Sequence, residues 1–368
     1  MEKILFLSRS LGAGGAEKRM VTVARLLKKR GCEIKLISYS NNKFFSDQLE
    51  KENISVVWLL EGGFWKKLRT IRDIIKHEHF QTVISFLPTL NIINCIASIG
   101  LKHKVIIGES SASSQFEQFM GWKYVIRAHV EDWLAWAFAD FIVSNSDNAR
   151  DLRKKRSKFL SKKIGTIHNP VSVPTPKLDY ICKKDGILHV VVAASVQPIK
   201  NPIAVIKAIS ELEVKYRTQL KLDWYGSVID ESLKEQVIRE IETAHLEKTI
   251  NFHDATNDIG VVMGQADIVA LFSVAEGLPN AICEGMMLGK PIIMTRISDY
   301  KKMVDELNGF LCDSNDIISI KDAFVNAIDT PETNLLSMGK KSQEIAVKLF
   351  SPEKVGDEWH TLIRNINQ

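Results

Sequence analysis

The chain has 368 residues, of which 45% are hydrophobic and 25% are charged, with a formal net charge of +5. This length exceeds one ordinary hydrophobic core and suits two domains of about 150–200 residues each. No apolar run reaches the roughly 20 residues that a membrane-spanning helix needs. Five scattered cysteines without a CxxC pair indicate neither a disulfide framework nor a zinc site.

The charge is unevenly distributed along the chain. Residues 1–172 contain 28 basic and 16 acidic residues, a net of +12, whereas the remainder contains 21 basic and 28 acidic residues, a net of −7. Such asymmetry favours two domains that meet different partners. The basic half suits an anionic partner, such as a membrane surface or a phosphorylated acceptor. The alternative is an uneven surface that meets no partner.

The first half alternates short β-rich runs with segments of helical period. Strands are predicted at 4–7, 34–37, 83–86, 105–107 and 141–143, and helices at 15–30, 64–79 and 89–101. The first run is too short for the core of a signal peptide, so we expect a buried first strand and a cytoplasmic protein. The rhythm predicts a parallel sheet wrapped by helices.

A glycine loop follows the first predicted strand and precedes a helix. It contains Gly12, Gly14 and Gly15. Glycines let backbone N–H groups approach a phosphate, and the helix N-terminus adds the positive end of a dipole. The spacing is neither GxGxxG nor a Walker A loop, so it predicts neither NAD binding nor ATP phosphate transfer. A tight turn that needs positive φ is the alternative.

Two basic segments of the first half suit an anionic surface. The segment 64–76 is amphipathic, with Phe64, Leu68, Ile71 and Ile75 on one face. This pattern is typical of an interfacial helix in anionic lipid or of a helix packed on the sheet with solvated lysines. Residues 150–163 hold eight basic residues, a density that favours anionic lipid or a diphosphate-linked acceptor. Phe159 is the single aromatic residue in this segment, so aromatic stacking residues are not interleaved with the basic ones and nucleic-acid binding is not expected.

The second half repeats the β-α rhythm after a proline-rich boundary. Pro170, Pro174 and Pro176 precede a polar stretch at 183–186, and this composition predicts a linker at 170–186. Strands are predicted at 188–193, 220–225, 268–271 and 291–294, and helices near 201–216, 231–244, 279–289 and 316–328. Two doubly wound domains joined by one linker predict a ligand cleft between the carboxyl ends of their strands.

Two carboxylates flank the start of a predicted helix after the strand at 268–271. Pro279 suits the first helical position, so the helix should begin near Leu278, with Glu276 in the loop at its positive end and Glu284 inside it. Two such acceptors suit hydroxyl groups at the two ends of an extended ligand, with a phosphate at the helix-end amides between them. Helix capping by Glu276 and a solvated Glu284 are the alternatives.

This segment resembles the E-x7-E signature of retaining glycosyltransferase family 4 (glycosyl transferases group 1). The resemblance covers nearly the whole chain, including the segments 14–17, 138–146, 167–171, 198–201, 266–267 and 289–292. It implies an α/β fold of the GT-B type, with two doubly wound Rossmann-like domains and an interdomain cleft. We expect an acceptor-side domain at 1–172, a donor-binding domain at 173–350, and a terminal helix at 352–366 that packs back on the first domain.

The resemblance implies that the chemistry is carried by three charged residues. Glu284 would bind the ribose hydroxyls of the donor nucleotide. Glu276 would lie beside the donor sugar as a catalytic residue. Lys200 would neutralise the diphosphate leaving group, which accumulates charge as the glycosidic bond breaks.

The remaining implied contacts come from backbone and amide groups. The donor sugar and diphosphate would meet Gly277, Leu278, Pro279 and Asn280, while the phosphates would be covered from the other domain by Gly14 and Gly15. The base would rest near Tyr225, Gly226 and the turn at 253–256. The resemblance implies neither a metal ion nor a cofactor, and His168 and His253 lie singly in predicted turns.

The chain departs from the family pattern at two positions. Ser195 stands where the family usually has an arginine, and Ser110 stands where many members have a histidine. Small hydroxyls therefore replace two groups that normally meet the diphosphate or the reacting sugar. Arg9 and Lys18 are candidates to supply the missing positive charge.

The resemblance implies transfer of a hexose or N-acetylhexosamine from a nucleotide-sugar donor to a glycan or polyprenyl-diphosphate-linked acceptor in cell-surface polysaccharide biosynthesis. The anomeric configuration would be retained. A nucleotide-sugar epimerase-like GT-B enzyme and a catalytically weak sugar-nucleotide-binding protein are the alternatives. We expect the protein in the cytoplasm. An anionic membrane surface, at the inner face of the cell membrane, is a further candidate partner.

Overall fold

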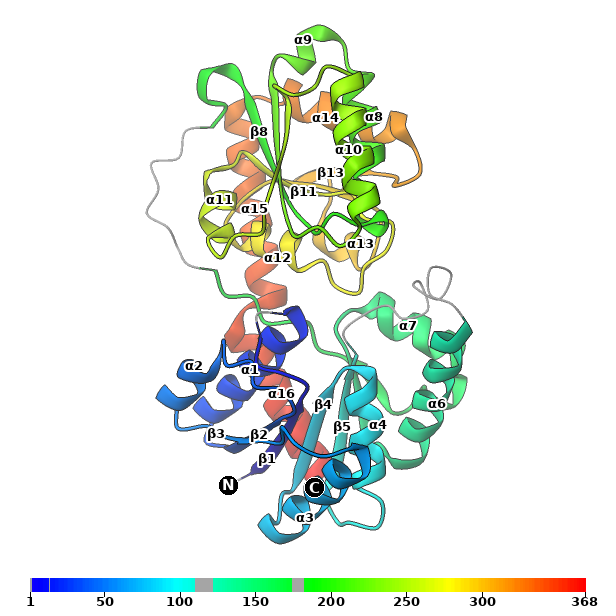
Figure 1. Ribbon diagram of the computed structural model, residues 1–368. Coiled ribbons are helices and arrows are strands. Elements are labelled where there is room, and N and C mark those ends of the chain that lie inside the picture. The colour runs from blue at the N-terminus through cyan, green and yellow to red at the C-terminus, as the bar shows by residue number, and fades with distance from the viewer. Residues whose placement is uncertain (1, 13, 110–121, 174–181) are drawn as a thin grey trace. The chain divides into compact units, whose positions relative to one another are not determined.

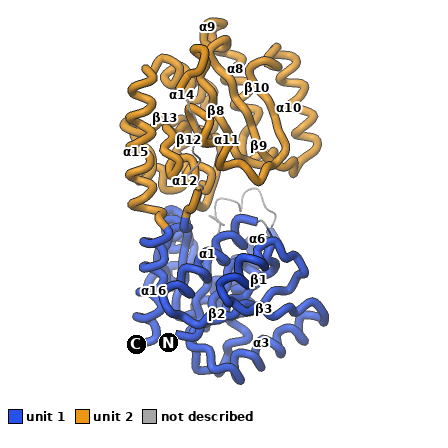
Figure 2. The backbone as a smooth tube through the Cα atoms, turned by 90° about the vertical axis from the view of Figure 1, so that its left-hand side faces the viewer, with its two compact units in different colours: residues 1–170, 352–368 blue, residues 171–351 orange. Residues whose placement is uncertain are grey.

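The computed structural model describes residues 2–12, 14–109, 122–173 and 182–368. The chain divides into two compact units, drawn in different colours in Figure 2. Unit 1 comprises residues 1–170 and 352–368, and unit 2 comprises residues 171–351. The predicted boundary at 172/173 therefore lies two residues from the observed division. Ala13, Ser110, Pro174 and Pro176 lie outside the described residues.

Unit 1 is built on a seven-stranded parallel sheet with the strand order β3-β2-β1-β4-β5-β6-β7. The strands are β1 (Lys3–Ser8), β2 (Glu33–Ser38), β3 (Ser55–Trp58), β4 (Thr82–Phe86), β5 (Lys104–Glu109), β6 (Phe141–Ser144) and β7 (Ile164–Thr166). The order reverses between β1 and β4, so the carboxyl ends of these two strands form the switch point at which such sheets bind ligands.

Helices connect the strands of unit 1, and the last helix of the chain returns to it (Figure 1). They are α1 (Gly15–Lys29), α2 (Ser46–Lys51), α3 (Phe64–Glu78), α4 (Pro88–Ala97), α6 (Trp122–Phe138), α7 (Asp147–Arg156) and α16 (Pro352–Asn367), with a short 3₁₀ turn, η1 (Lys158–Leu160).

The terminal helix α16 packs on α1 through both charge and apolar contacts. Arg30, after the end of α1, donates from Nε to the Asp357 carboxylate over 2.9 Å. A Cβ atom on Gly356 would lie 2.3 Å from the same guanidinium group, so the absence of a side chain at this position leaves room for Arg30 against α16. Trp359 is fully buried and makes an edge contact with Phe86 at the end of β4. Residues more than 270 positions apart in the chain thus share one core.

Unit 2 is built on a six-stranded parallel sheet with the order β10-β9-β8-β11-β12-β13. The strands are β8 (Leu188–Ala193), β9 (Leu220–Tyr225), β10 (Ile250–His253), β11 (Ile268–Leu271), β12 (Ile292–Thr295) and β13 (Gly309–Cys312). The helices are α8 (Pro202–Ser210), α9 (Val214–Arg217), α10 (Glu231–Thr243), α11 (Ile259–Gln265), α12 (Asn280–Met287), α13 (Tyr300–Met303), α14 (Ile317–Asp329) and α15 (Glu332–Phe350), with 3₁₀ turns η2 (Lys184–Gly186) and η3 (Pro198–Lys200).

The predicted strands are all present, but four further strands were not predicted. These are β3, β7, β10 and β13, and each forms an edge of its sheet. Central strands such as β4 and β11 are buried at every position, whereas the four edge strands are only partly buried. An edge strand meets neighbours on one side only, so its sequence lacks the continuous apolar run that marks a central parallel strand.

The single helix predicted near 201–216 is divided in the structure. The 3₁₀ turn η3 ends before Asn201, whose φ of 64° lies in the left-handed region, and α8 begins at Pro202. The helix α8 ends at Ser210, and the short α9 follows. Proline fits the first turn of a helix because its missing N–H has no helical partner there. Asn201 therefore separates the turn that carries Lys200 from the helix that packs on the sheet.

The amphipathic helix α3 supports the packing interpretation along its C-terminal half. Ile71 and Ile75 are buried in the core beside β1 and β4. Phe64 and Trp65 at its N-terminus are exposed and contact each other edge to face. The apolar face that we predicted is therefore largely covered by the protein itself, and only its first turn remains available to another surface.

A network of buried charges lies inside unit 1. Asp132 of α6 is completely buried and accepts hydrogen bonds from Arg153 Nε and Arg156 Nε, each over 2.8 Å, and from the Ser157 hydroxyl over 2.5 Å. Burial by itself would raise the pKa of Asp132, but the two guanidinium groups and the hydroxyl hold this pKa below its ordinary value. The basic segment at 150–163 thus directs part of its charge inward.

We predict that Asp132→Ala destabilises the protein by about 3–5 kcal/mol, because it leaves two guanidinium groups without their buried partner. The measurement is urea-induced unfolding of the full chain. Since the folded-state pKa of Asp132 is depressed, its contribution should be present above the unfolded-state pKa of about 3.9 and be lost as the pH falls below it.

Asp151→Ala is the matched control. Asp151 lies on the same helix as the arginines and pairs with Arg150 over 2.8 Å, but it is exposed to solvent. Its removal should cost less than about 1 kcal/mol. Equal destabilisation by the two variants would contradict a special role for the buried carboxylate.

Candidate functional site

The carboxyl ends of three neighbouring strands in unit 2 bring the predicted donor-site residues together. Strands β8, β11 and β12 are adjacent in the sheet. The turn η3 follows β8 and ends with Lys200, and the loop after β11 carries Glu276. Lys200 Nζ donates a hydrogen bond to Glu276 Oε1. The two residues are separated by 76 positions in the sequence, so this pair is formed by the topology of the sheet.

The lysine and the glutamate are both largely shielded from water. Their side chains are 18% and 14% exposed, respectively. Desolvated charges of opposite sign stabilise each other, and removing one would leave the other without compensation. The pair therefore presents a positive and a negative group, already paired, at the end of the sheet where parallel α/β folds bind ligands.

Hydrogen bonds fix the loop that carries Glu276. The Ser273 hydroxyl donates to Glu276 Oε1 over 2.8 Å, and the Thr295 hydroxyl at the end of β12 donates to the Ser273 carbonyl over 2.6 Å. The Val274 N–H donates to the Ile199 carbonyl over 2.8 Å, which ties this loop to the turn η3. The carboxylate is thus positioned by groups from three strands.

A second set of contacts fixes the approach of Lys200. Asn201 donates from its side-chain amide to the Ser314 carbonyl over 2.7 Å. Its left-handed backbone turns the chain sharply directly after Lys200. An asparagine tolerates this conformation better than most residues. The turn that carries Lys200 is therefore fixed by the hydrogen bond that Asn201 donates to the Ser314 carbonyl.

The loop from Gly277 to Asn280 differs from the predicted helix start. Pro279 has a ψ of 85° and precedes the helix, so α12 begins at Asn280 and the predicted start near Leu278 is wrong by two residues. Gly277 and the side chain of Leu278 are buried, and the Ser298 hydroxyl donates to the Gly277 carbonyl. These residues form a packed, extended bend between Glu276 and α12.

Glu284 lies in the second turn of α12 and is partly exposed. The helix rests directly on the sheet at the following residue, since a Cβ atom on Gly285 would lie 2.6 Å from the Val269 side chain. This close approach fixes the rotation of α12 and hence the direction of Glu284. Cys283 beside it is fully buried, and burial, followed by the nearby Glu284 charge, raises the pKa of its thiol well above the ordinary value. It is not a reactive thiolate.

The glycine loop of unit 1 does not owe its glycines to backbone strain. Gly14 has a φ of −66°, and neither Gly12 nor Gly15 is among the residues at positive φ, so the tight-turn alternative is wrong for these glycines. Gly14 and Gly15 are exposed at the N-terminus of the 15-residue helix α1. The first-turn N–H groups of a helix have no partner within the helix and favour an anion.

A buried arginine beneath this loop was not predicted. Arg19 donates to the Glu109 carbonyl over 2.7 Å and to the Ile167 carbonyl over 3.3 Å, and its guanidinium lies 4.8 Å from the centre of the Phe86 ring. Burial, partly offset by the charge of Glu109, lowers the pKa of Arg19 to about 9. The residue ties together the carboxyl ends of β4, β5 and β7. Its helical spacing is a signal that could have found it, because Val23 and Leu27, four and eight residues further along α1, are buried, whereas the polar Thr22 follows Lys18 at the same spacing of four.

The two positions that depart from the family pattern can be placed only in part. Ser195 accepts a hydrogen bond from the Gln197 amide over 2.8 Å at the end of β8. Ser110 lies outside the described residues. Arg9 and Lys18, the candidate replacement cations, are both exposed and flank the glycine loop of unit 1.

A charged cluster at β9 and β10 corrects the prediction that His253 lies singly. His253 Nε2 lies 2.9 Å from Asp223 Oδ1, and His189 Nε2 lies 2.6 Å from Asp223 Oδ2. Burial alone would raise the pKa of Asp223, but hydrogen bonds from His189, His253 and Asn251 hold it below its usual range. His253 also stacks on Tyr225, with ring centres 4.4 Å apart.

The region predicted for the base borders a hollow of about 550 Å³. Gly226, His253 and Asp254 line it, together with the inner face of α10. A Cβ atom on Gly226 would lie 2.0 Å from the Ala194 carbonyl oxygen, so only glycine allows β9 to end this close to β8. The residues predicted to contact the base, Tyr225, Gly226 and residues 253–256, are therefore neighbours in space.

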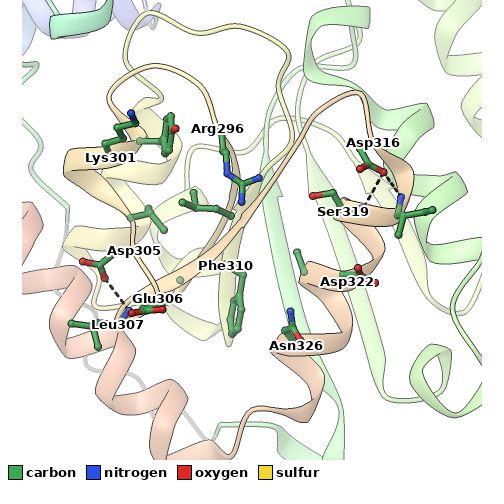
Figure 3. Close-up of a pocket in the computed structure, with 16 residues that line it drawn as sticks. Arg296, Lys301, Asp305, Glu306, Leu307, Phe310, Asp316, Ser319, Asp322 and Asn326 are labelled. Atoms are coloured by element: carbon green, nitrogen blue, oxygen red, sulfur yellow. Dashed lines mark hydrogen bonds between the residues drawn. The ribbon is translucent and has the colours of Figure 1, made fainter.

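A larger hollow of about 780 Å³ lies at the opposite edge of the sheet, between α13 and α14 (Figure 3). Two of the charged residues that line it, Arg296 and Asp316, have partners close by. Arg296 pairs with Asp313 over 3.0 Å, and Asp316 accepts hydrogen bonds from two N–H groups at the start of α14. Lys200, Glu276 and Glu284 do not line it. Size alone therefore does not identify the site of the chemistry.

Metal-binding clusters and membrane-spanning helices are both absent from the part of the chain that the structure describes. Within residues 2–12, 14–109, 122–173 and 182–368, no group of three or more His, Cys, Asp or Glu side chains is arranged to hold a metal ion. Across the same ranges, no helix combines the length and the apolar character needed to cross a membrane.

Comparison with known proteins connects this geometry to a family. The family model described as Glycosyl transferases group 1 matches residues 183–344, which include the loops of Lys200 and Glu276. An uncharacterized glycosyltransferase of Haemophilus influenzae is 28% identical over 372 residues, covering 99% of this chain and 100% of the relative.

Two further similarities extend along the chain. The Campylobacter jejuni enzyme named GalNAc-alpha-(1->4)-GalNAc-alpha-(1->3)-diNAcBac-PP-undecaprenol alpha-1,4-N-acetyl-D-galactosaminyltransferase is 23% identical over 381 residues, covering 100% of this chain and 99% of the relative. The crystal structure of Anabaena HepE in complex with UDP has a TM-score of 0.83 at 17% identity, covering 99% of this chain and 100% of that one. The match at the paired loops and the structural agreement along the whole length lead to one conclusion: residues 183–344 are similar to the group 1 glycosyltransferases, and the chain has the GT-B fold.

Proposed function

We propose that the protein transfers a hexose or an N-acetylhexosamine from a nucleotide-sugar donor to a glycan or polyprenyl-diphosphate-linked acceptor, with retention of the anomeric configuration, in cell-surface polysaccharide biosynthesis. The observation that carries the proposal is the paired Lys200 and Glu276 at adjoining strand ends, within the residues that match the family. The names of the Campylobacter relative and of an Escherichia coli relative, a UDP-Gal:alpha-D-GlcNAc-diphosphoundecaprenol alpha-1,3-galactosyltransferase, support the lipid-linked acceptor.

The pair suggests how a donor enters. Without a ligand, Glu276 neutralises Lys200. A diphosphate offers Lys200 Nζ a second anionic partner, while the Glu276 carboxylate then accepts hydrogen bonds from hydroxyls of the donor sugar. Because the carboxylate is already held by Ser273, it changes partner without a large movement. The cost of ordering the site is therefore met in the folded protein before the donor binds.

The transfer itself requires charge stabilisation at the leaving group. As the bond between the anomeric carbon and the diphosphate oxygen breaks, negative charge grows on that oxygen, and Lys200 stabilises it. The acceptor hydroxyl attacks the same face of the sugar, forms the new carbon–oxygen bond, and gives its proton to the departing diphosphate. This sequence retains the configuration without a covalent sugar-enzyme intermediate. Lysine and helix-end amides supply the positive charge in this proposal, so no metal ion or cofactor takes part.

The other predicted contacts complete the donor site. Glu284 accepts hydrogen bonds from the ribose hydroxyls, Gly277 to Asn280 contact the sugar and diphosphate, and Gly14 and Gly15 contribute N–H groups from unit 1.

The proposed location is the cytoplasmic face of the membrane, where a nucleotide sugar and a lipid-linked acceptor meet. Incubation with a panel of nucleotide sugars, with and without lipid-linked acceptor, separates this function from epimerisation, which needs no acceptor, and from binding without turnover.

We expect Glu284→Ala to weaken the affinity for the nucleoside diphosphate by about 10- to 100-fold, because a hydrogen bond to a charged acceptor is lost. Isothermal calorimetry with UDP measures this; UDP is the first nucleotide to test because it occupies the HepE structure. Glu235→Ala, which removes an exposed carboxylate of α10, is the control. Unchanged affinity in the Glu284 variant would remove the ribose assignment.

Lys200→Ala should lower kcat by about 10²- to 10³-fold while weakening donor binding less, because the charge on the leaving group grows in the transition state. Steady-state kinetics with a lipid-linked acceptor gives both values. The matched variant is Lys207→Ala, since Lys207 is an exposed lysine on α8. A turnover number that is unaffected by the loss of Lys200 would rule out its role at the leaving group.

The new glycosidic linkage should have the anomeric configuration of the donor. Proton NMR of the product distinguishes the two anomers by the coupling between the anomeric proton and the proton on the neighbouring carbon of the transferred sugar. An inverted product would refute the same-face mechanism, and a sugar trapped covalently on Glu276 would refute only the absence of an intermediate.

A further inference from the structure

Helix α6 of unit 1 directs two acidic residues inward and its tryptophans outward. Glu131 and Asp132 face the interior, whereas Trp122 and Trp133 are 68% and 58% exposed. A helix on the surface of a globular protein normally has the opposite arrangement, with an apolar stripe towards the core and charges towards water.

Interior hydrogen bonds hold α6 in this orientation. Asp132 is anchored by Arg153 and Arg156, and Glu131 accepts a hydrogen bond from the buried Asn91 amide over 2.8 Å. Asn91 belongs to α4, against which α6 packs. Rotation of the helix to bury its tryptophans would break the ion pairs of Asp132 and the hydrogen bond between Asn91 and Glu131. The outward face is therefore a fixed property of the fold.

The exposed apolar residues form one continuous stripe. Their spacing of four, four, three and three residues keeps them on one side of the helix. The stripe consists of Trp122, Ile126, Val130, Trp133 and Trp136, and it extends onto η1 through Phe159, whose ring lies 6.1 Å from that of Trp136. We call these six residues the tryptophan face. A contiguous apolar patch of this kind marks a surface that another body covers.

Basic residues border the tryptophan face. Lys123 and Arg127 lie on α6 itself, and Lys158 and Lys162 lie on and after η1, all four exposed. Tryptophan is enriched where apolar lipid meets water, because its ring is apolar and its N–H is polar. Lysine and arginine beside it match anionic headgroups.

We propose that the tryptophan face docks the protein on an anionic lipid bilayer, with α6 lying in the interface. The proposal rests on the proposed function, which places the acceptor at a membrane. Charge complementarity favours lipid over a second copy of this chain, since a symmetric pair would bring the same basic border together from both copies. The tryptophan face is a better membrane contact than helix α3, because Ile71 and Ile75 of α3 are buried in the core.

The test uses the full chain and a charge-introducing double variant, Trp122→Glu with Trp133→Glu. Trp65→Glu is the matched control, because Trp65 is 76% exposed but lies on α3. The probe is sedimentation with vesicles of phosphatidylcholine alone or with 30% phosphatidylglycerol added. We expect the double variant to lower the partition coefficient on anionic vesicles by about tenfold or more, and the control to change it by less than about twofold.

Two further measurements identify the mode of contact. Binding of the unaltered protein should fall as salt rises, since charges in water are screened beyond about 10 Å at 0.1 M ionic strength. Its tryptophan fluorescence should be quenched by lipids brominated in the upper acyl chain, and this quenching should be reduced in Trp122→Phe with Trp133→Phe. Thermal unfolding of each variant verifies that it is folded.

Three outcomes would overturn the proposal. They are equal binding to neutral and anionic vesicles, equal loss of binding in the Trp65 control, and a dimer of the unaltered protein that the double variant converts to a monomer. The last result would assign the tryptophan face to a second copy of the chain. Absence of UDP binding in calorimetry would count against the proposed function only. It would leave the membrane proposal standing, because binding to vesicles requires no nucleotide.

Discussion

The ion pair between Lys200 and Glu276 depends on the order of strands in unit 2. Strands β8 and β11 are neighbours although β9 and β10 separate them in the sequence. Their adjacency brings the turn after one and the loop after the other within hydrogen-bonding distance. The two charges are largely buried, and each compensates the other, so removing one partner alone would leave an unpaired charge. The same arrangement leaves a cation and an anion at the strand ends, and the proposed transfer of a sugar from a diphosphate uses both charges.

Unit 1 uses buried charge for a different purpose. Asp132, Arg153 and Arg156 are interior groups that determine how α6 is rotated. A segment that is rich in lysine and arginine is therefore partly structural, and the basic charge that reaches the surface is smaller than the sequence indicates. The rotation turns the tryptophans of α6 outward. An electrostatic constraint inside the unit thus creates an apolar surface outside it.

The sequence predicts the parts of this structure that local patterns encode. Continuous apolar runs such as 188–193 and 268–271 coincide with central strands, because a strand buried on both faces tolerates few polar residues. The edge strands β3, β7, β10 and β13 escaped prediction for the same reason, since their partly exposed positions interrupt the run. The start of α12 was displaced because proline is compatible with both the first helical position and the extended residue before it.

The candidate site also has features that local sequence patterns predict and features that depend on long-range contacts. The candidate residues Lys200, Glu276 and Glu284, the glycine loop and the resemblance to family 4 come from the sequence alone, because each is carried by a short motif whose residue types and spacing are read directly. Only the tertiary structure decided that Lys200 meets Glu276, that Arg19 donates to the Glu109 carbonyl, and that His189 and His253 share Asp223. The orientation of α6 belongs to this second group. Each of these contacts joins residues far apart in the chain, and their meeting depends on strand order and burial, which periodicity within one segment does not contain.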